Sequence, residues 1–241
     1  MSNITGKSGQ SLTAANGLVL SAEGVSRVFG SGATAVTALS SIDLSVAQGD
    51  FLAVTGRSGS GKTTLLNLLS GLDRPTTGTV RFQGEDLAGL REAELVQIRR
   101  HKIGFIFQSF GLMPLLSAQE NVELPLHIGG VSWRERRQRA NEALAAVGLA
   151  SRARHRPYEL SGGEQQRVSI ARALVTTPDV VFADEPTGEL DTATARSIAE
   201  TLGEVASSRR ATVIVATHDL ELAATARRRL DLVDGGIISK N

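Results

Sequence analysis

The sequence predicts an α/β fold, in which an open parallel sheet carries helices and one stretch of the chain is entirely helical. Three observations lead to this prediction. Apolar runs at residues 51–55, 103–107, 179–183 and 212–217 have the length of buried strands, and each is followed by polar or glycine-rich sequence. Helical patterns separate several of these runs. From residue 109 to about 176 the strand patterns stop and only helical patterns remain.

Composition allows a sizeable core and excludes several classes of protein. The 241 residues are 41% hydrophobic, which suits one domain with a subdivision or two small domains. The formal net charge is +1, from 26 basic and 25 acidic residues, so we expect no nucleic-acid partner. The absence of cysteine excludes disulfides and thiol catalysis. No apolar run reaches about 18 residues, so we expect any membrane role to be peripheral.

The folded sequence is expected to begin near Leu18. Residues 1–17 are polar, with no apolar core of the length a secretory signal needs, and we expect a disordered tail. Strands are predicted at residues 18–29 and 41–46. The first ends in Phe29, which suits stacking on an adenine ring, with an ordinary core aromatic as the alternative.

The strand at residues 51–55 leads into GRSGSGKTT, which matches the phosphate-binding loop pattern in full and precedes a helical run. The glycines let backbone N–H groups point into one concavity, the helix start adds positive potential, and Lys62 adds a formal charge. The hydroxyl of Thr63 suits Mg²⁺, which prefers oxygen ligands. A glycine-rich surface turn is the alternative. We predict a triphosphate site made by Gly56, Arg57, Ser58, Gly59, Ser60, Gly61, Lys62, Thr63 and Thr64.

Beyond this loop, a strand is predicted at residues 79–82, a helix at 92–101 and a strand at 103–107, which Gln108 follows directly. The carboxyl end of a parallel strand is where open sheets bind ligands, so Gln108 can complete a Mg²⁺ shell or position water. Taken alone, the position is more often structural.

Two helices are expected in the middle of the chain, one starting at Ser117 and one over residues 132–147. In the second, an apolar stripe contains Trp133, Ala140, Leu144 and Val147. Its four arginines are interleaved with glutamate, which favours a solvated helix face over a nucleic-acid surface.

The sequence LSGGEQQR opens a further helix that runs to about residue 176. Ser161 and Glu164 have the spacing of a capping box, and the two glycines between them leave backbone N–H groups exposed. A capped helix needs no glycine pair in its first turn, because glycine weakens a helix. We therefore predict a second anion site at Ser161, Gly162, Gly163 and Glu164, with plain capping as the alternative.

The strand at residues 179–185 ends in two carboxylates, Asp184 and Glu185. Successive strand residues point to opposite sides, so we expect one carboxylate to face Mg²⁺ and the other an attacking water. His218 ends the strand at residues 212–217 and would reach the same sheet edge, although a lone histidine there is more often structural. The basic triplet at residues 227–229 is expected to cap a helix, before a strand at 230–233.

In chain order, the phosphate loop, Gln108, LSGGEQQR, VVFADE and ATHD resemble the ATP-binding subunit of an ABC transporter, over about residues 18–238. Shorter stretches such as FIFQ, QENV and ADEPTG resemble the subgroup of lipoprotein release, macrolide export and cell division (LolD-, MacB- and FtsE-like). The resemblance implies a RecA-like P-loop core with an antiparallel β patch, an ATP-binding domain at residues 18–240, and an inserted all-helical subdomain at about 109–176.

The resemblance also implies the site. ATP would lie between the phosphate loop of one copy and the Ser161 helix start of a second, in a head-to-tail homodimer. Phe29 would stack on adenine, where the subgroup often has tyrosine. The remaining roles implied are Mg²⁺ binding by Thr63 and Gln108, binding of its waters by Asp184, activation of water by Glu185, and contact with the γ-phosphate by His218.

The function implied is ATP hydrolysis that drives membrane permease subunits (FtsX- or MacB-like) from the cytoplasmic face of the inner membrane. Two alternatives are weighed. A soluble ABC-type ATPase of translation or DNA repair usually carries two cassettes or a long coiled-coil insertion, and this chain has neither. A phosphate-loop kinase is opposed by LSGGE. Glu189 stands where a small or neutral residue is commoner in the family it resembles, next to the dimer seam.

Overall fold

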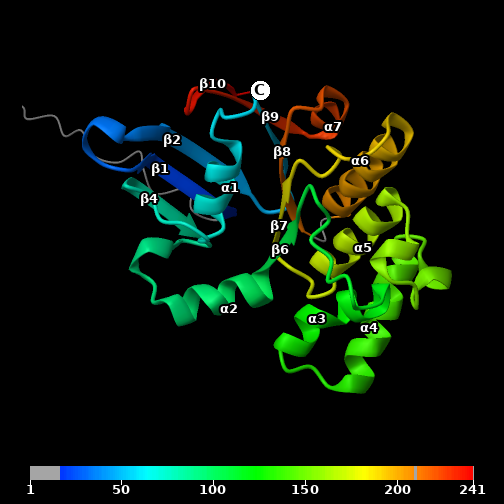
Figure 1. Cartoon of the computed structure of the whole chain (residues 1–241). Coiled ribbons are helices and arrows are strands. Elements are labelled where there is room, and N and C mark those ends of the chain that lie inside the picture. Colours follow the sequence, from blue (N-terminus) through cyan, green and yellow to red (C-terminus); the bar gives the residue numbers. More distant parts are fainter. Residues whose placement is uncertain (1–16, 209–210, 241) are drawn as a thin grey trace, which may run out of the picture.

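The computed structural model describes residues 17–208 and 211–240 (Figure 1). The expected tail at residues 1–17 lies outside this part of the chain, except for Gly17. Two sheets form the framework, one with strand order β2-β1-β4-β5 and one with order β10-β9-β3-β8-β7-β6. Figure 1 shows the first sheet on the left, the second in the centre and the helices α3, α4, α5 and α6 on the right.

The six-stranded sheet is parallel except at one edge, where β10 pairs with β9 in the antiparallel sense. All residues of the central strands β3 and β8 are buried, as expected for parallel strands covered on both faces. The carboxyl ends of β3, β6, β7 and β8 therefore meet at one edge. The six strands are β3 (Phe51–Thr55), β6 (Ile103–Ile106), β7 (Val180–Asp184), β8 (Thr212–Thr217), β9 (Arg228–Val233) and β10 (Gly236–Lys240).

The second sheet is antiparallel throughout. It consists of β1 (Leu18–Phe29), β2 (Val36–Ala47), β4 (Thr77–Phe82) and the short β5 (Glu85–Asp86). The buried residues of β1, β2 and β4 share one core with helix α1 (Lys62–Leu69), which follows the phosphate loop. The antiparallel sheet thus packs beside the helix that carries Lys62.

Strand alternation divides the interior into two cores, one on each face of the six-stranded sheet. In β3, Phe51 and Ala53 belong to the core shared with the helical region, whereas Leu52 and Val54 belong to the core shared with α1 and the antiparallel sheet. One strand therefore holds both layers together, and the phosphate loop follows directly from its end.

Between β6 and β7 the described chain contains helices and no strands, as predicted. Ser117, Ser132 and Ser161 each accept a hydrogen bond from a backbone N–H in the first turn of the helix that follows, and Glu120 and Glu164 complete two capping boxes. The helices of the chain after α1 are α2 (Glu92–Lys102), α3 (Ala118–Ile128), α4 (Trp133–Ala146), α5 (Gly162–Leu174), α6 (Thr192–Ser207) and α7 (Leu220–Thr225). Within residues 17–208 and 211–240, none of the helices has the length and hydrophobicity needed to cross a bilayer.

Two expectations about side chains are wrong. Ala140 and Leu144 are fully buried, but Trp133 at the start of α4 is 59% exposed, with the Arg137 guanidinium 5.4 Å from its ring centroid. The basic triplet does not cap a helix, because α7 ends at Thr225 and β9 begins at Arg228. The Arg228 guanidinium lies 2.7 Å from the carboxylate of Asp50. This ion pair stabilises Arg228 as the first residue of β9.

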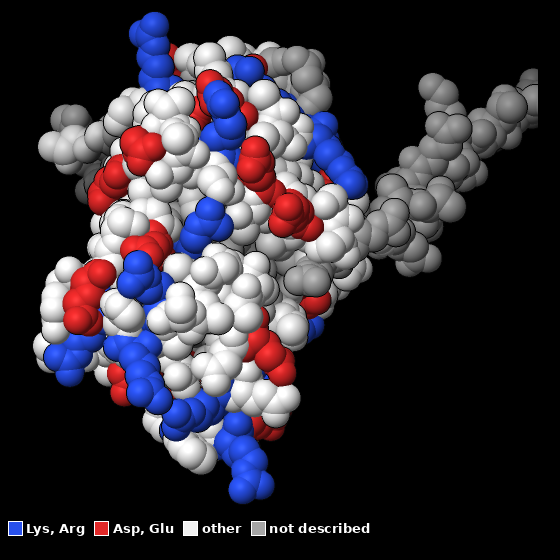
Figure 2. Space-filling model, turned by 90° about the vertical axis from the view of Figure 1, so that its right-hand side faces the viewer, with Lys and Arg blue, Asp and Glu red and all other residues white. Residues whose placement is uncertain are grey.

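The arginines of α4 mostly have partners within the chain. Arg136 pairs with Glu123, and Arg139 contacts Glu135 and the carbonyl of residue 175. Figure 2 shows positive and negative side chains interspersed on this side of the molecule, with Lys and Arg gathered in its lower part. These pairs agree with the solvated helix face expected from the sequence.

Candidate nucleotide-binding and catalytic site

The loop between β3 and α1 is shaped by glycines that no other residue can replace without movement. A Cβ added at Gly56 would lie 2.3 Å from the carbonyl oxygen of Leu232, and one added at Gly61 would lie 2.5 Å from that of Ala38. Gly61 also has a φ of 103° at the start of α1, a conformation that L side chains rarely adopt. The backbone is therefore held close to its neighbours, and the N-terminus of α1 points into the loop.

Lys62 is the cation of this loop. It is only 7% exposed, and its ammonium donates to the carbonyls of Gly56 at 2.9 Å and Arg57 at 3.2 Å. The same nitrogen lies 3.4 Å from Oε1 of Glu185. A buried ammonium with these partners is positioned to exchange the carboxylate for a phosphate oxygen.

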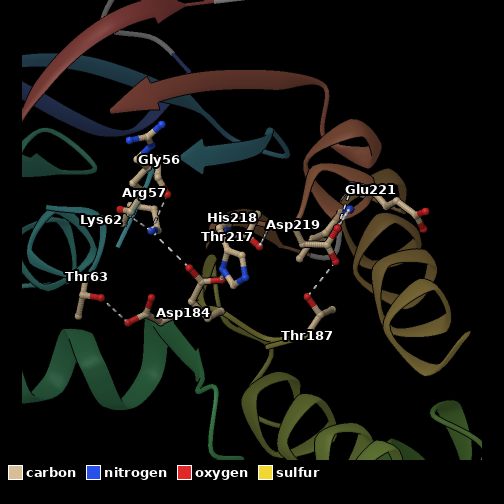
Figure 3. Close-up of polar contacts among 12 residues, drawn as sticks. Gly56, Arg57, Lys62, Thr63, Asp184, Thr187, Thr217, His218, Asp219 and Glu221 are labelled. Atoms are coloured by element: carbon tan, nitrogen blue, oxygen red, sulfur yellow. Dashed lines mark hydrogen bonds and ion pairs between the residues drawn. The ribbon is translucent and has the colours of Figure 1, made fainter. Parts of the chain in front are cut away.

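Thr63 and Asp184 meet across the cavity from α1 and β7. The Thr63 hydroxyl donates to Oδ2 of Asp184 at 2.8 Å (Figure 3). The other oxygen, Oδ1, is buried, and no residue in the described part of the chain bonds it. Burial raises the pKa of the Asp184 carboxyl; the Thr63 hydrogen bond opposes this and the nearby Glu185 charge adds to it. The site thus holds a buried carboxylate oxygen with no hydrogen-bond donor among the described residues.

Glu185 and His218 form a second contact pair at the same edge. Nδ1 of His218 lies 2.8 Å from Oε2 of Glu185, and the His218 backbone N–H donates to the same oxygen at 3.2 Å. An ionised carboxylate only accepts, so Nδ1 carries the proton in this arrangement. In a neutral ring Nε2 is then unprotonated and can only accept. It can donate to another group only when the ring holds a second proton. For a neutral ring, donation elsewhere requires the contact with Glu185 to break.

Strand alternation does not separate the two carboxylates as expected. β7 ends at Asp184, and Glu185 has a φ of 46°, in the left-handed region, with its N–H bonded to the carbonyl of Ala216. A non-glycine residue in this region is strained, and such strain concentrates at functional sites. As a result both carboxylates line the same cavity, although they face different partners.

These side chains surround a cavity of about 740 Å³ at the carboxyl edge of the sheet. Its lining includes most of the phosphate-loop residues together with Gln108 and both carboxylates. The full lining is Val36, Thr37, Ala38, Arg57, Ser58, Gly59, Gly61, Lys62, Thr63, Thr64, Gln108, Asp184, Glu185 and His218.

Some predicted site residues lie outside this lining. Gly56 and Ser60 line a neighbouring pocket instead, and the Ser60 hydroxyl is buried without a hydrogen-bond partner among the described residues. Phe29 does not line the cavity, but its cross-strand partner Val36 does. The helix start at Ser161, Gly162, Gly163 and Glu164 does not line it either.

At that helix start, the Ser161 hydroxyl accepts the N–H of Glu164, and hydrogen bonds from the Ser161 backbone and side chain lower the pKa of the Glu164 carboxyl. The Glu164 carboxylate accepts the N–H of Ser161 and pairs with Arg152 at 3.1 Å. A Cβ added at Gly162 would lie 3.4 Å from the Leu190 side chain. The helix start is therefore an ordered, partly exposed surface next to the loop before α6.

Sequence reasoning missed several residues that organise the site. Gln166 is fully buried, and its amide donates to the carbonyl of Pro186 at 2.6 Å, which ties α5 to the loop after β7. The Thr187 hydroxyl donates to the carboxylate of Asp219, which is the residue that follows His218 (Figure 3). The start of β2 at Val36 adds one wall of the cavity. The position of Gln166 in LSGGEQQR was visible in the sequence, but its burial was not.

Comparison with known proteins identifies relatives of this chain. The chain matches the ABC transporter family over residues 39–188. It is 49% identical over 211 residues to the lipoprotein-releasing system ATP-binding protein LolD of Geobacter metallireducens, covering 88% of this chain and 94% of LolD. It is 46% identical over 215 residues to the macrolide export ATP-binding/permease protein MacB of Hyphomonas neptunium, covering 89% of this chain and 33% of MacB. The chain therefore spans about a third of such MacB proteins.

A solved structure agrees with these relatives. The dimeric structure of a post-hydrolysis state of the ATP-binding cassette MJ0796 bound to ADP and Pi matches with a TM-score of 0.85 and 42% identity, covering 92% of this chain and 97% of that one. This match confirms the predicted class of fold, while the bounds 109–176 of the helical subdomain stay a prediction. The family match, the sequence relatives and the solved structure agree with the order of motifs along the chain. The chain therefore belongs to the ABC transporter family, as one of its ATPase subunits.

Proposed function

We propose that two copies of this chain close around two ATP molecules and that this closure drives conformational change in membrane permease subunits. One observation carries the proposal: the phosphate loop, Asp184, Glu185 and His218 meet at one cavity, whereas the ordered helix start at Ser161 does not line it. A second copy, placed head to tail, supplies the missing helix start. The dimeric structure of the MJ0796 cassette, bound to ADP and Pi, supports this arrangement.

The phosphates of ATP bind at the loop from Gly56 to Thr64. Backbone N–H groups and the N-terminus of α1 receive the oxygens, and Lys62 contacts the outer phosphates, which replace the Glu185 carboxylate as its partner. From the second copy, the Ser161 hydroxyl and the N–H groups of Gly162 and Gly163 reach the γ-phosphate. Phe29 stacks on adenine at the rim.

The oxygen donors of the cavity fit Mg²⁺. Asp184 has a buried oxygen without a partner, and the Thr63 hydroxyl and the Gln108 amide oxygen belong to the same cavity. The described residues contain no group of three His, Asp or Glu side chains able to hold a metal alone, so phosphate oxygens and water would complete the shell. When bound, Mg²⁺ neutralises phosphate charge beside the two carboxylates.

Glu185 acts as the general base for water. Its carboxylate is held by the His218 ring and backbone, so it faces the place where the γ-phosphate lies beyond Lys62. It accepts the proton of the attacking water. The His218 backbone N–H holds Glu185 in register, and the His218 ring contacts the γ-phosphate once it leaves Glu185 or is doubly protonated.

The partner class follows from the relatives' names. LolD belongs to a lipoprotein-releasing system and MacB joins an ATP-binding part to a permease, which supports permease subunits of the FtsX or MacB type for this chain. Such a subunit works at the cytoplasmic face of the inner membrane as a peripheral protein. A soluble ABC-type ATPase of translation or DNA repair is the alternative, and the names of these relatives argue against it.

The test is the Glu185→Gln variant. We expect it to bind ATP as the wild type does, to lose hydrolysis by a factor on the order of a hundred or more, and to accumulate as an ATP-bound dimer, because the amide cannot accept the proton. The measurements are ATP affinity, steady-state phosphate release and dimer mass by size-exclusion chromatography with light scattering.

Lys62→Ala is the matched comparison, because it removes a charge-assisted phosphate contact and should lose ATP binding itself. Hydrolysis by Glu185→Gln near the wild-type rate would remove Glu185 from its role. Co-purification from solubilised membranes addresses the partner: a native protein that stays soluble and unpartnered would favour the alternative.

A further inference from the structure

Phe29 lies at the tip of β1 beside the nucleotide cavity. It is the Cα partner of Val36 in β2, and cross-strand partners project to the same side of a sheet. Val36 lines the cavity, so the Phe29 ring stands at the rim on that side, 43% exposed. An aromatic ring in this position needs support, because a strand tip leaves it free to change rotamer.

Arg27 provides that support from the same face of β1, two residues away. Its guanidinium carbon lies 4.4 Å from the centroid of the Phe29 ring, which is the geometry of a cation–π contact. One face of the ring is thus covered by the guanidinium, and a base would stack on the other.

Asp73 fixes the guanidinium. Nε and Nη2 of Arg27 donate to the two carboxylate oxygens of Asp73 at 2.8 and 2.9 Å. Both side chains are partly buried, with 24% and 28% exposed. Two parallel hydrogen bonds hold the plane of the guanidinium more firmly than a single contact would.

Asp73 belongs to the turn that follows α1, the helix that begins with Lys62. The N–H groups of Leu72 and Asp73 both donate to the carbonyl of Asn67 in the last turn of α1, at 2.9 and 3.1 Å. A continuous path therefore connects the phosphate-binding helix to Asp73, Arg27 and the Phe29 ring. It joins helix α1 to strand β1 of the antiparallel sheet.

We propose that Arg27 is a positioning residue for recognition of the nucleotide base. Held by its two hydrogen bonds to Asp73, Arg27 keeps the Phe29 ring at a fixed place relative to the phosphate loop. The adenine and the triphosphate of ATP would then each bind to groups that are already in position. The inference rests on the proposed function, in which Phe29 stacks on adenine. It assigns Arg27 no contact with the phosphates.

The test compares ATP with inorganic tripolyphosphate, which lacks the base, by calorimetry in the presence of magnesium chloride. We expect Arg27→Ala to weaken ATP binding by about three- to tenfold, the size of a lost cation–π contact and its ordering effect, and to leave tripolyphosphate binding unchanged. The KM for ATP should rise by a similar factor. In a Phe29→Ala background, Arg27→Ala should have no further effect.

Arg81→Ala is the matched control. Arg81 pairs with Glu23 in the same antiparallel sheet at 2.9 Å, away from Phe29, and its loss should change neither affinity. Wild-type ATP affinity in Arg27→Ala, or an equal loss for both ligands, would overturn the inference. Lys62→Ala distinguishes failure of this inference from failure of the proposed function, because it should bind neither ATP nor tripolyphosphate. A wild-type protein that binds neither ligand would overturn the proposed function itself.

Discussion

Asp184 is a carboxylate whose surroundings favour its protonated form. Burial raises its pKa, so the folded chain keeps the proton to a higher pH than the unfolded chain, in which aspartate titrates near 4. As the pH rises from the unfolded value through the folded pKa of Asp184, the free energy of unfolding falls. Above that folded pKa, the ionised Asp184 carboxylate costs stability at the proposed metal site of the protein.

The Asp184→Asn variant should be more stable than the wild type without nucleotide. Asparagine keeps an acceptor for the Thr63 hydroxyl and removes the charge. We expect a melting temperature higher by roughly 1 to 3 °C at pH 7, a modest gain because solvent partly screens the site. Thermal melts between pH 4 and 8 should show this gap shrinking toward pH 4. A variant less stable than the wild type at pH 7 would contradict the interpretation.

Asp191→Asn is the control of opposite sign. Hydrogen bonds from the side chain and backbone of Thr194, and from the backbone of Ala193, lower the pKa of Asp191. A group whose pKa is lower in the folded chain stabilises the fold at any pH above its pKa in the unfolded chain. This contribution is lost as the pH falls through its pKa in the folded chain. This variant should therefore melt below the wild type at neutral pH.

At the scale of single residues, the sequence predicted which side chains meet but not how. The identities of Lys62, Asp184 and His218 and their places after apolar strands were enough to assign them to one edge. The left-handed backbone of Glu185 was not predictable, because it depends on the hydrogen bond to Ala216 in a neighbouring strand. The support of Phe29 by Arg27 depends on Asp73, which is distant in sequence.

At the scale of elements, β6 and α5 are in unusually close contact. A Cβ added at Gly104 in β6 would lie 2.4 Å from the carbonyl oxygen of Ala173 in α5. Helix α5 begins at the proposed second anion site, and β6 ends just before Gln108. The contact therefore fixes the spacing between the two halves of the ATP machinery within one chain.

Gly104→Ala should force these elements apart. We expect a loss of about 1 to 3 kcal/mol in the free energy of unfolding, the range found when a packed interior is overfilled. Urea denaturation measures it. Gly203→Ala is the matched control: this glycine lies within α6 with open space around it, so alanine should stabilise by about 0.5 to 1 kcal/mol. Equal effects of the two changes would contradict the packing argument.

Elements with strong local signals were predictable, and those defined by pairing were not. The phosphate-loop helix and the capped helices α3, α4 and α5 appear where serine caps and glycine turns placed them. β5 has only two residues and exists because β4 pairs with it. The predicted strand at residues 230–233 begins two residues earlier in the structure, at Arg228. Arg228 is stabilised there by Asp50, which comes from a different part of the chain.

At the scale of the whole molecule, the proposed ATP site belongs to two copies. This can be tested by mixing variants that are each inactive. Lys62→Ala removes the phosphate contact, and Gly162→Asp adds a negative charge at the other half. A Cβ at Gly162 makes ordinary contacts of 3.4 and 3.6 Å, so that variant should fold.

An equal mixture should recover ATPase activity to about a quarter of the wild-type level. About half of the dimers are then mixed, and each mixed dimer has one site in which both halves are intact. Hydrolysis no greater than the sum of the separate variants would contradict a site shared in this way. The resemblance to ABC transporter subunits implied a shared site, and the cavity lining, which omits Ser161, supports it.

The placement of Trp133 has an optical consequence. It is the only tryptophan in the chain, and it stands exposed at the first turn of α4, away from the residues that line the nucleotide cavity. Intrinsic fluorescence excited at the tryptophan band thus reports on the helical region alone. The native protein carries its own probe there, and rapid-mixing fluorimetry can time movement of α4 after ATP is added, with no label attached.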